Sequence, residues 1–200
     1  MNGVYFKPWL GENYGKTKTL ILGESAYGWR DKNGRIWHPS PSAPKKSLFY
    51  WLKHLEKRNY FSSMSKVLCK TDHPTTEQAK REWNEYAYAI YVQGTVGEGA
   101  RKRPSSLQWE CAAHLLLRLI ENLRPLKIIV TGLDMWNHHM PGCNGPHLRD
   151  DLQAYKLSDG TLVWCLALPH PANTRQGFKW EKIGESIRQF ESAKLPLREN

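Results

Sequence analysis

Thr19-Leu20-Ile21-Leu22-Gly23-Glu24-Ser25 is the stretch of sequence from which the fold can be worked out. Its first five residues form a short, largely apolar, β-prone run that ends at a glycine, which is typical of a buried parallel strand. An acid and a serine follow directly. We therefore expect residues 19–23 to form a central strand, with Glu24 and Ser25 at its carboxyl end.

Three further apolar runs have the same character and are predicted as strands: residues 86–93 (YAYAIYVQ), 126–132 (LKIIVTG) and 162–168 (LVWCLAL). Helical segments are expected between most of these strands. This alternation is typical of a parallel sheet with crossover connections. The sequence therefore predicts an α/β fold in one domain, with a central, mostly parallel four-stranded sheet and helices on both faces.

Apolar residues recur at spacings of three and four in the segments predicted as helices, which are residues 47–57, 75–85, 106–123 and a last helix marked by Trp180, Ile183, Ile187 and Phe190. Thr75 and Thr76 are possible N-caps, and Pro125 ends the third of these helices. The remaining long segments lack periodicity. We expect a surface loop at 27–47, a basic loop at 97–104 and irregular structure at 133–150.

The size and charge of the chain limit its class. Its 200 residues, 40% of them hydrophobic, suffice for one core, so we expect a single domain over residues 1–200 with a polar tail at 194–200. Lys and Arg number 29 against 19 Asp and Glu, which gives a net charge of +10. Such an excess is typical of a protein that binds a polyanion such as nucleic acid.

Neither membrane segments nor metal sites are expected. The N-terminus lacks the pattern of a signal peptide, and no apolar run is long enough to span a membrane, so we expect a cytoplasmic protein without membrane contact. Cysteines are far apart, and the spacing of the closest group of metal-ligating residues matches no zinc module. That group is His138, His139, Cys143 and His147. We expect no metal and no cofactor.

Polar residues follow the predicted strands. In open α/β sheets, ligands bind at the carboxyl ends of the strands. Glu24 and Ser25 follow the first predicted strand, Gln93 ends the second, Asp134 lies just beyond the third, and His170 follows the fourth. We expect these residues to lie near one another at one edge of the sheet.

Two short motifs resemble those of the uracil-DNA glycosylase superfamily. Residues 20–28 (LILGESAYG) are similar to its first motif, in which a strand ends in Gly and then Gln or Glu. Residues 170–178 (HPANTRQGF) resemble its second motif, a His-Pro-Ser loop that ends in Gly-Phe and enters the minor groove. Residues 128–132, followed by Trp136, are similar to a third, structural stretch.

The resemblance implies an enzyme that flips a base out of DNA and hydrolyses its N-glycosidic bond. Glu24, Ser25 and His170 are then catalytic. The charges that develop on the sugar and on the departing base suit a carboxylate and an imidazole donor. The base-binding residues it implies are Tyr27, Gln93 and Asn173. The DNA-binding residues are Arg101, Lys102, Arg103, Arg175 and Lys179, of which Arg175 would hold the duplex where a base has left.

Departures from the family pattern leave the substrate open. Ser25 stands where uracil-specific enzymes carry a catalytic Asp, and Ala26 stands where they carry Pro. No clear Asn ends the second strand. Gln93 can read a base edge with its amide or cap the strand, and Tyr27 can wall the pocket or pack under the loop. Uracil and other altered pyrimidines, including phage-modified cytosine in antiviral defence, are therefore candidate substrates.

We expect a monomeric, monofunctional glycosylase, because no lysine stands at a motif position where it could form an imine with the sugar. Two alternatives remain. The missing Asp would permit a DNA-binding relative of the same fold without catalysis. A nucleotide or nucleoside hydrolase would instead act on free nucleotides and bind DNA weakly, which fits the basic charge less well.

Overall fold

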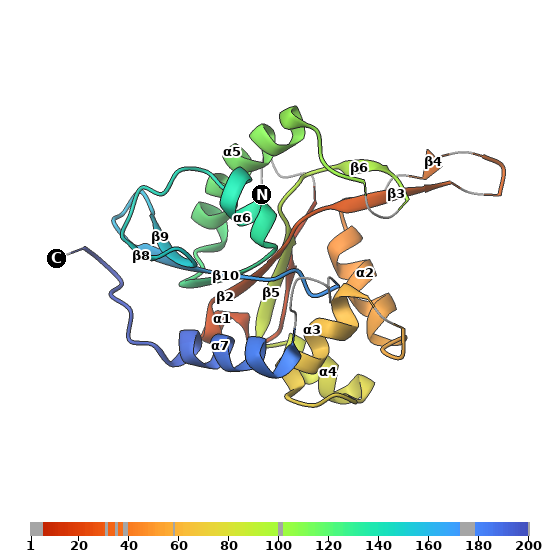
Figure 1. The fold of residues 1–200 in the computed structure, drawn as a ribbon, viewed down its shortest axis with the longest axis horizontal. Helices are drawn as coiled ribbons and strands as arrows, with labels where there is room; N and C mark the ends of the chain where they lie inside the picture. The colour runs from red at the N-terminus through yellow and green to blue at the C-terminus, as the bar shows by residue number, and fades with distance from the viewer. Residues whose placement is uncertain are drawn as a thin grey trace.

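The computed structural model of the chain describes residues 6–30, 32–34, 36–37, 40–57, 59–99, 102–172 and 179–199. They form one α/β domain around a mixed, mostly parallel sheet (Figure 1). The strand order in this sheet is β1-β5-β2-β7-β10-β9-β8. A second, smaller sheet has the order β4-β3-β6.

The four predicted strands form the centre of the main sheet. They are β5 (Tyr86–Ile90), β2 (Thr19–Gly23), β7 (Lys127–Thr131) and β10 (Leu162–Leu168), and adjacent members run parallel. Leu22 of β2 lies opposite both Ala89 of β5 and Val130 of β7. Nearly every residue of these strands is buried, as expected for strands covered on both faces. Burial on both faces therefore explains why these four segments are continuous apolar runs in the sequence.

The prediction of four strands is wrong for the sheet as a whole, which has seven. Strand β1 (Trp9–Leu10) pairs antiparallel with β5. At the other edge, β9 (Leu152–Lys156) pairs antiparallel with β10, and β8 (His147–Arg149) pairs with β9. β1 and β8 have two and three residues, and β8 is exposed. Runs this short carry little periodic signal, and β9, with five residues, was not among the predicted strands.

The segments predicted as loops contain the smaller sheet. Strand β3 (Ala26–Arg30) pairs with β4 (Ile36–Trp37) and with β6 (Thr95–Glu98), and in Figure 1 it extends from the end of β2 away from the main sheet. The prediction of one continuous surface loop over 27–47 is therefore wrong. Glycine-rich composition concealed strands that pair between distant segments.

Helices α5 (Ser106–Leu123) and α7 (Trp180–Ser192) lie where the periodicity predicts them. The bounds of α5 follow from its ends: Ser105 and Gln108 form a capping box, and Arg124 adopts a left-handed conformation before Pro125. Thr75 likewise caps α4 (Thr76–Trp83). The remaining helices are α1 (Tyr14–Thr17), α2 (Ala43–Leu52), α3 (Tyr60–Cys69) and α6 (Leu133–His139).

All four of these helices differ from expectation. α1 was not predicted, and α2 begins and ends earlier than the helix predicted at residues 47–57. α3 was not predicted at all, although Asn59 caps it through a capping box with Ser62. α6 and β8 occupy the segment 133–150, which was predicted as irregular, so that prediction is wrong. α6 begins directly after β7, at Gly132, and is too short for its periodicity to be recognised.

The helices cover both faces of the main sheet. One core contains buried residues of α2, α3, α4 and α7, and the other contains buried residues of α1, α5 and α6. Alternate residues of β2 point to opposite cores: Ile21 belongs to the first, Leu20 and Leu22 to the second. Within the part of the chain that the structure describes, no helix combines the length and apolar character needed to cross a membrane.

Candidate functional site at the carboxyl ends of the strands

The carboxyl ends of β2, β7 and β10 lie side by side because these strands are parallel neighbours. Glu24 follows β2, Gly132 follows β7, and His170 follows β10. A Cβ atom at Gly132 would lie 3.8 Å from Oε2 of Glu24, so the carboxylate of Glu24 reaches over the end of β7. The predicted acid therefore lies at the edge where α/β sheets bind ligands.

Glu24 is held by Arg103. Its Oε1 lies 2.8 Å from Nη1 of Arg103, and the Glu24 side chain is only 10% exposed. The other terminal nitrogen of Arg103 pairs with Asp134 on α6, and the guanidinium lies 5.6 Å from the ring centroid of Trp109. Arg103 is thus bound to two carboxylates and an aromatic ring, which together define its position.

The environment of Glu24 raises the pKa of its carboxyl group. Burial is the largest cause, since it disfavours the charged form, and Asp134 raises the pKa further. Arg103 acts in the opposite direction through its charge and its hydrogen bond. The ionised form of Glu24 therefore depends on Arg103.

Replacing Arg103 by Met is expected to raise the pKa of Glu24 further, because the charge and the hydrogen bond with which Arg103 favours the ionised form would both be lost. Asp134→Asn is the matched variant with the opposite sign: it removes a like charge and should lower this pKa. NMR titration of proteins with ¹³C-labelled glutamate carboxyl groups measures both. An unchanged or lower pKa in Arg103→Met would contradict this account of the site.

His170 packs against Tyr60, the first residue of α3. The ring centroids lie 5.7 Å apart. The Oγ1 of Thr131 donates to the carbonyl of Leu22 (2.8 Å), so the Tyr60 hydroxyl, 3.0 Å from the same oxygen, donates to Thr131. A hydrogen-bonded chain from the end of β2 through β7 to α3 thereby fixes the surface on which the imidazole rests.

The contacts of His170 define its protonation. The backbone N–H of Ala172 donates to Nδ1 at 3.2 Å, so the proton of a neutral imidazole lies on Nε2. Burial lowers the pKa of His170, and the positive charge of Arg103 lowers it further. At neutral pH, His170 is therefore a neutral N–H donor. Glu24 and His170 follow β2 and β10, which are the two neighbours of β7 in the sheet.

Tyr60 and Thr131 were missed by the sequence reasoning. The sequence predicts Thr131 as part of a strand and gives it no further role. Tyr60 begins α3, a helix that was not predicted. The sequence did contain a signal: Asn59 followed by apolar residues at 61, 64, 67 and 68 is typical of a capped amphipathic helix. Nothing in the sequence indicated that its first residue contacts His170.

The same edge of the sheet also carries three other predicted site residues: Gln93, Ser25 and Tyr27. The backbone N–H groups of Tyr91 and Val92 bind the carbonyls of Gly23 and Glu24, which keeps the end of β5 beside that of β2. Oε1 of Gln93 accepts from the N–H of Phe6 (2.7 Å), and Nε2 donates to the carbonyl of Ile90. These are the contacts of the strand-capping alternative. Reading of a base by Gln93 would require them to break.

Tyr27 lies on β3 and is partly buried against the core formed with α5 and α6. This arrangement matches the packing alternative for Tyr27. It leaves part of the side chain accessible beside the end of β2. Ser25, between β2 and β3, is also partly exposed.

The predicted DNA-binding residues differ in their surroundings. Lys102 and Lys179 are exposed, and Lys179 immediately precedes α7. Arg103 engages Glu24 and Asp134, as described above. Arg101, Asn173 and Arg175 lie outside the described residues, as does most of the second motif.

The histidines and the cysteine of segment 138–147 make separate contacts. Nδ1 of His138 lies 3.2 Å from Oδ1 of Asp134, the ring of His139 stacks on Trp109 at 4.0 Å, and Cys143 donates to the carbonyl of Ala154 at 2.8 Å. Throughout the described ranges, no three His, Cys, Asp or Glu side chains come together in a way that could hold a metal ion.

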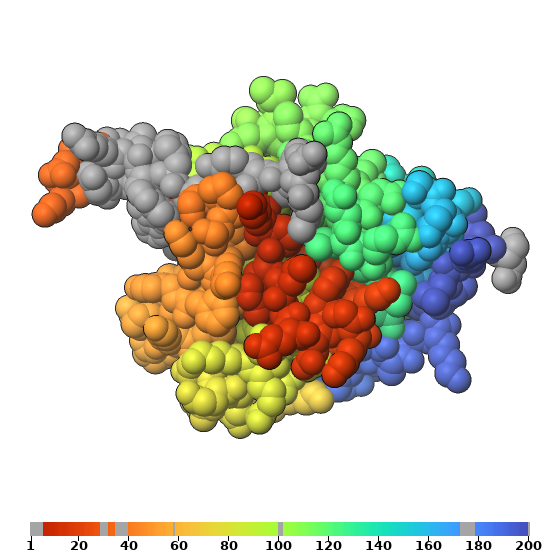
Figure 2. Space-filling model, turned by 180° about the vertical axis from the view of Figure 1, so that it is seen from behind, coloured from red at the N-terminus to blue at the C-terminus, as the bar shows by residue number. Residues whose placement is uncertain are grey.

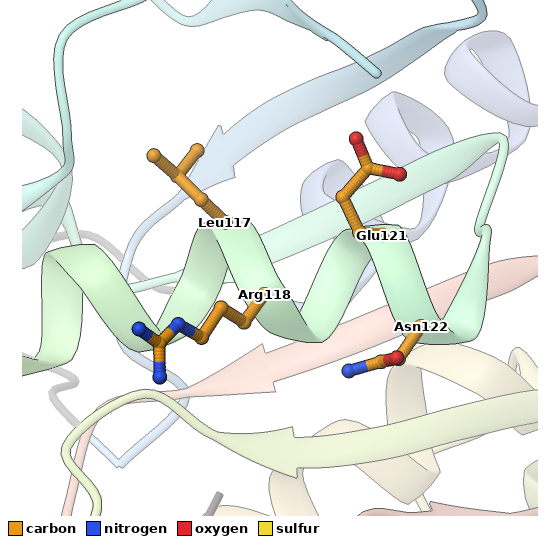
Figure 3. A pocket seen from close by; sticks show the side chains of 4 residues that line it. All are labelled: Leu117, Arg118, Glu121 and Asn122. Carbon is orange, nitrogen blue, oxygen red and sulfur yellow. The ribbon is translucent and has the colours of Figure 1, made fainter. Parts of the chain in front are cut away.

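A surface hollow of about 340 Å³ lies elsewhere, along α5. Its lining side chains all come from this one helix: Leu117, Arg118, Glu121 and Asn122 (Figure 3). Glu121 is already engaged, since its carboxylate accepts from the backbone N–H of Ser158 at 2.6 Å. None of the residues at the strand ends lines this hollow, and we assign it no part in the site.

Comparisons with known proteins add no assignment. No family model matches the chain, and no curated protein matches it.

Proposed function

We propose that the protein is a DNA glycosylase that flips an altered base out of DNA and hydrolyses its N-glycosidic bond. The observation that carries this proposal is the placement of a largely buried carboxylate, Glu24, and a neutral imidazole donor, His170, after two parallel strands of one sheet. The first-motif and second-motif resemblances support it. So does the net charge of +10, because DNA is a polyanion.

The two side chains suit opposite ends of the breaking bond. As the bond lengthens, positive charge develops on the sugar and negative charge on the base. The carboxylate of Glu24 stabilises the sugar cation and orients the attacking water, while the Nε2–H of His170 donates to a carbonyl oxygen of the departing base. The oxygen of water forms a bond to the sugar carbon as the bond from that carbon to the base nitrogen breaks, and the proton that the water loses balances the one that the departing base takes up. The products are the free base and an abasic site.

Altered pyrimidines are the proposed substrate class. Ser25 in place of an Asp leaves Glu24 as the acid at this strand end, and Tyr27 stands beside it to limit the size of the base. Phage DNA that carries modified cytosine is one source of such bases, so antiviral defence is a role consistent with the proposal. Arg101, Lys102, Arg175 and Lys179 would contact phosphates or hold the duplex.

A base-release screen tests the proposal. DNA that carries uracil, hypoxanthine or glucosylated hydroxymethylcytosine is incubated with the protein and then treated with alkali, which cleaves abasic sites. We expect alkali-labile sites with at least one pyrimidine substrate. Retarded bands without such sites would identify a DNA-binding protein that lacks catalysis. Activity confined to free nucleotides, with weak and salt-insensitive DNA binding, would identify a nucleotide or nucleoside hydrolase.

A further inference from the structure

The outward face of α2 combines basic and aromatic side chains. Its exposed residues recur at helical spacing and are Lys45, Lys46, Phe49, Tyr50 and Lys53. The opposite face is buried in the core through Ala43, Pro44, Leu48 and Leu52. The helix is therefore attached to the core mainly through this buried face. We call these five exposed residues the aromatic–lysine face of α2.

Two rings of this face are presented to solvent in fixed positions. Tyr50 is 53% exposed, and its ring is supported from the side by Trp51 and His54 at centroid distances of 5.0 and 4.8 Å. Phe49 is 37% exposed and makes an edge-to-face contact with Trp9 of β1. Such packing limits the freedom of the rings, so less entropy is lost when a flat ligand stacks on them.

The charge of the face selects an anionic ligand. α2 contains no acidic residue, and the nearest acid that follows it, Glu56, lies 3.6 Å from His54. Three lysines thus surround two exposed rings on one helix. A single aromatic or lysine on a surface needs no explanation, but exposed rings beside several lysines form the combination that binds unpaired nucleotides, through base stacking and phosphate contacts.

The position of the face suits this ligand. In Figure 1, α2 lies between β3, which continues from the end of β2, and α3, whose first residue contacts His170. Figure 2 shows α2, in orange, at the surface beside the N-terminal segment in red, in agreement with the contact between Trp9 and Phe49. The helix that carries this face thus packs against α3, whose first residue contacts His170.

We propose that the aromatic–lysine face of α2 binds a single-stranded stretch of DNA. Lysine ammonium groups contact its phosphates, and Tyr50 and Phe49 stack on unpaired bases. The choice of DNA as the nucleic acid rests on the proposed function. Paired bases cannot stack on the rings, so duplex DNA should not use the aromatic contacts.

The test measures binding of a short, fluorescein-labelled oligothymidylate without any altered base, by anisotropy at several salt concentrations. Replacing Lys45, Lys46 and Lys53 together by Gln should weaken binding roughly 100-fold at about 0.1 M salt. The slope of the logarithm of affinity against the logarithm of salt concentration should become shallower by about 2, because each lost phosphate contact of single-stranded DNA contributes about 0.7. The matched control replaces three exposed lysines elsewhere: Lys16, Lys80 and Lys182. It has the same net charge but should keep the original slope.

Tyr50→Ala tests stacking separately and should weaken oligothymidylate binding roughly 5- to 100-fold, whereas Tyr50→Phe keeps the ring and should bind as the wild type. Equal losses in both lysine triples, or no loss in Tyr50→Ala, would overturn the proposal. So would tighter binding of an RNA oligonucleotide with the same dependence on Tyr50. Because no base is excised in this assay, its outcome is independent of the base-release screen.

Discussion

Replacing Glu24 by Gln is expected to slow base release by roughly 10²- to 10⁴-fold while DNA affinity stays near that of the wild type. Gln has nearly the same shape and can still accept a hydrogen bond from Arg103, so the site should keep its geometry. It lacks the negative charge that stabilises the sugar cation and orients water. Single-turnover measurements with saturating protein report the chemical step separately from binding.

Glu185→Gln is the control for this variant. It removes a carboxylate from an exposed position on α7, where Glu185 pairs with Arg188 across one helical turn, and an exposed pair of this kind contributes little to stability. Its single-turnover rate should equal that of the wild type. Equal rates for Glu24→Gln and the wild type would remove Glu24 from the mechanism.

Replacing His170 by Ala is expected to slow base release by roughly 10²- to 10³-fold, the usual effect of losing one donor to a developing anion. His170→Gln should recover part of this rate, because a Gln amide can place an N–H group near the position of Nε2, whereas His170→Asn should not. Both polar variants retain hydrogen-bonding capacity, so their difference distinguishes donation to the base from a merely structural role. Equal rates in all three variants would argue against donation.

The pH dependence of the wild type follows from the same two residues. Base release requires ionised Glu24 and neutral His170, so the rate should fall as the pH falls and either group takes up a proton. Because the pKa of Glu24 is raised, its protonation should slow base release at a higher pH than that of an ordinary Glu. Because the pKa of His170 is lowered, its protonation should slow base release at a lower pH than that of an ordinary His. A rate that increases toward acid pH would instead identify the imidazolium as the donor.

The role of Arg103 suggested by the sequence differs from the contacts that it makes in the structure. A basic loop beside a predicted glycosylase site suggests a phosphate contact, yet the guanidinium engages Glu24 and Asp134. These partners lie 79 and 31 residues away along the chain. A DNA phosphate near this loop would compete with Asp134, the more exposed of the two carboxylates.

The sequence by itself determined the central strands and the helices with strong local signals. β2 and β10 have the predicted bounds, because continuous apolar runs ended by turn residues are specific to buried strands. α5 also begins and ends as predicted, because its cap, its periodicity and Pro125 are all local features. The expectation that Glu24 and His170 follow parallel strands came from the same local signals.

Only the tertiary structure decided the edge strands, the smaller sheet and the partners of the strand-end residues. Tyr60 reaches Thr131 across 71 residues, and Gln93 binds the backbone of Phe6 across 87. Such contacts depend on which segments the folded sheet brings together, and the type of a hydrogen-bonding residue does not indicate which distant residue it will bind. Local propensity acts over a few residues, whereas the pairing of distant segments is determined by burial of the whole core.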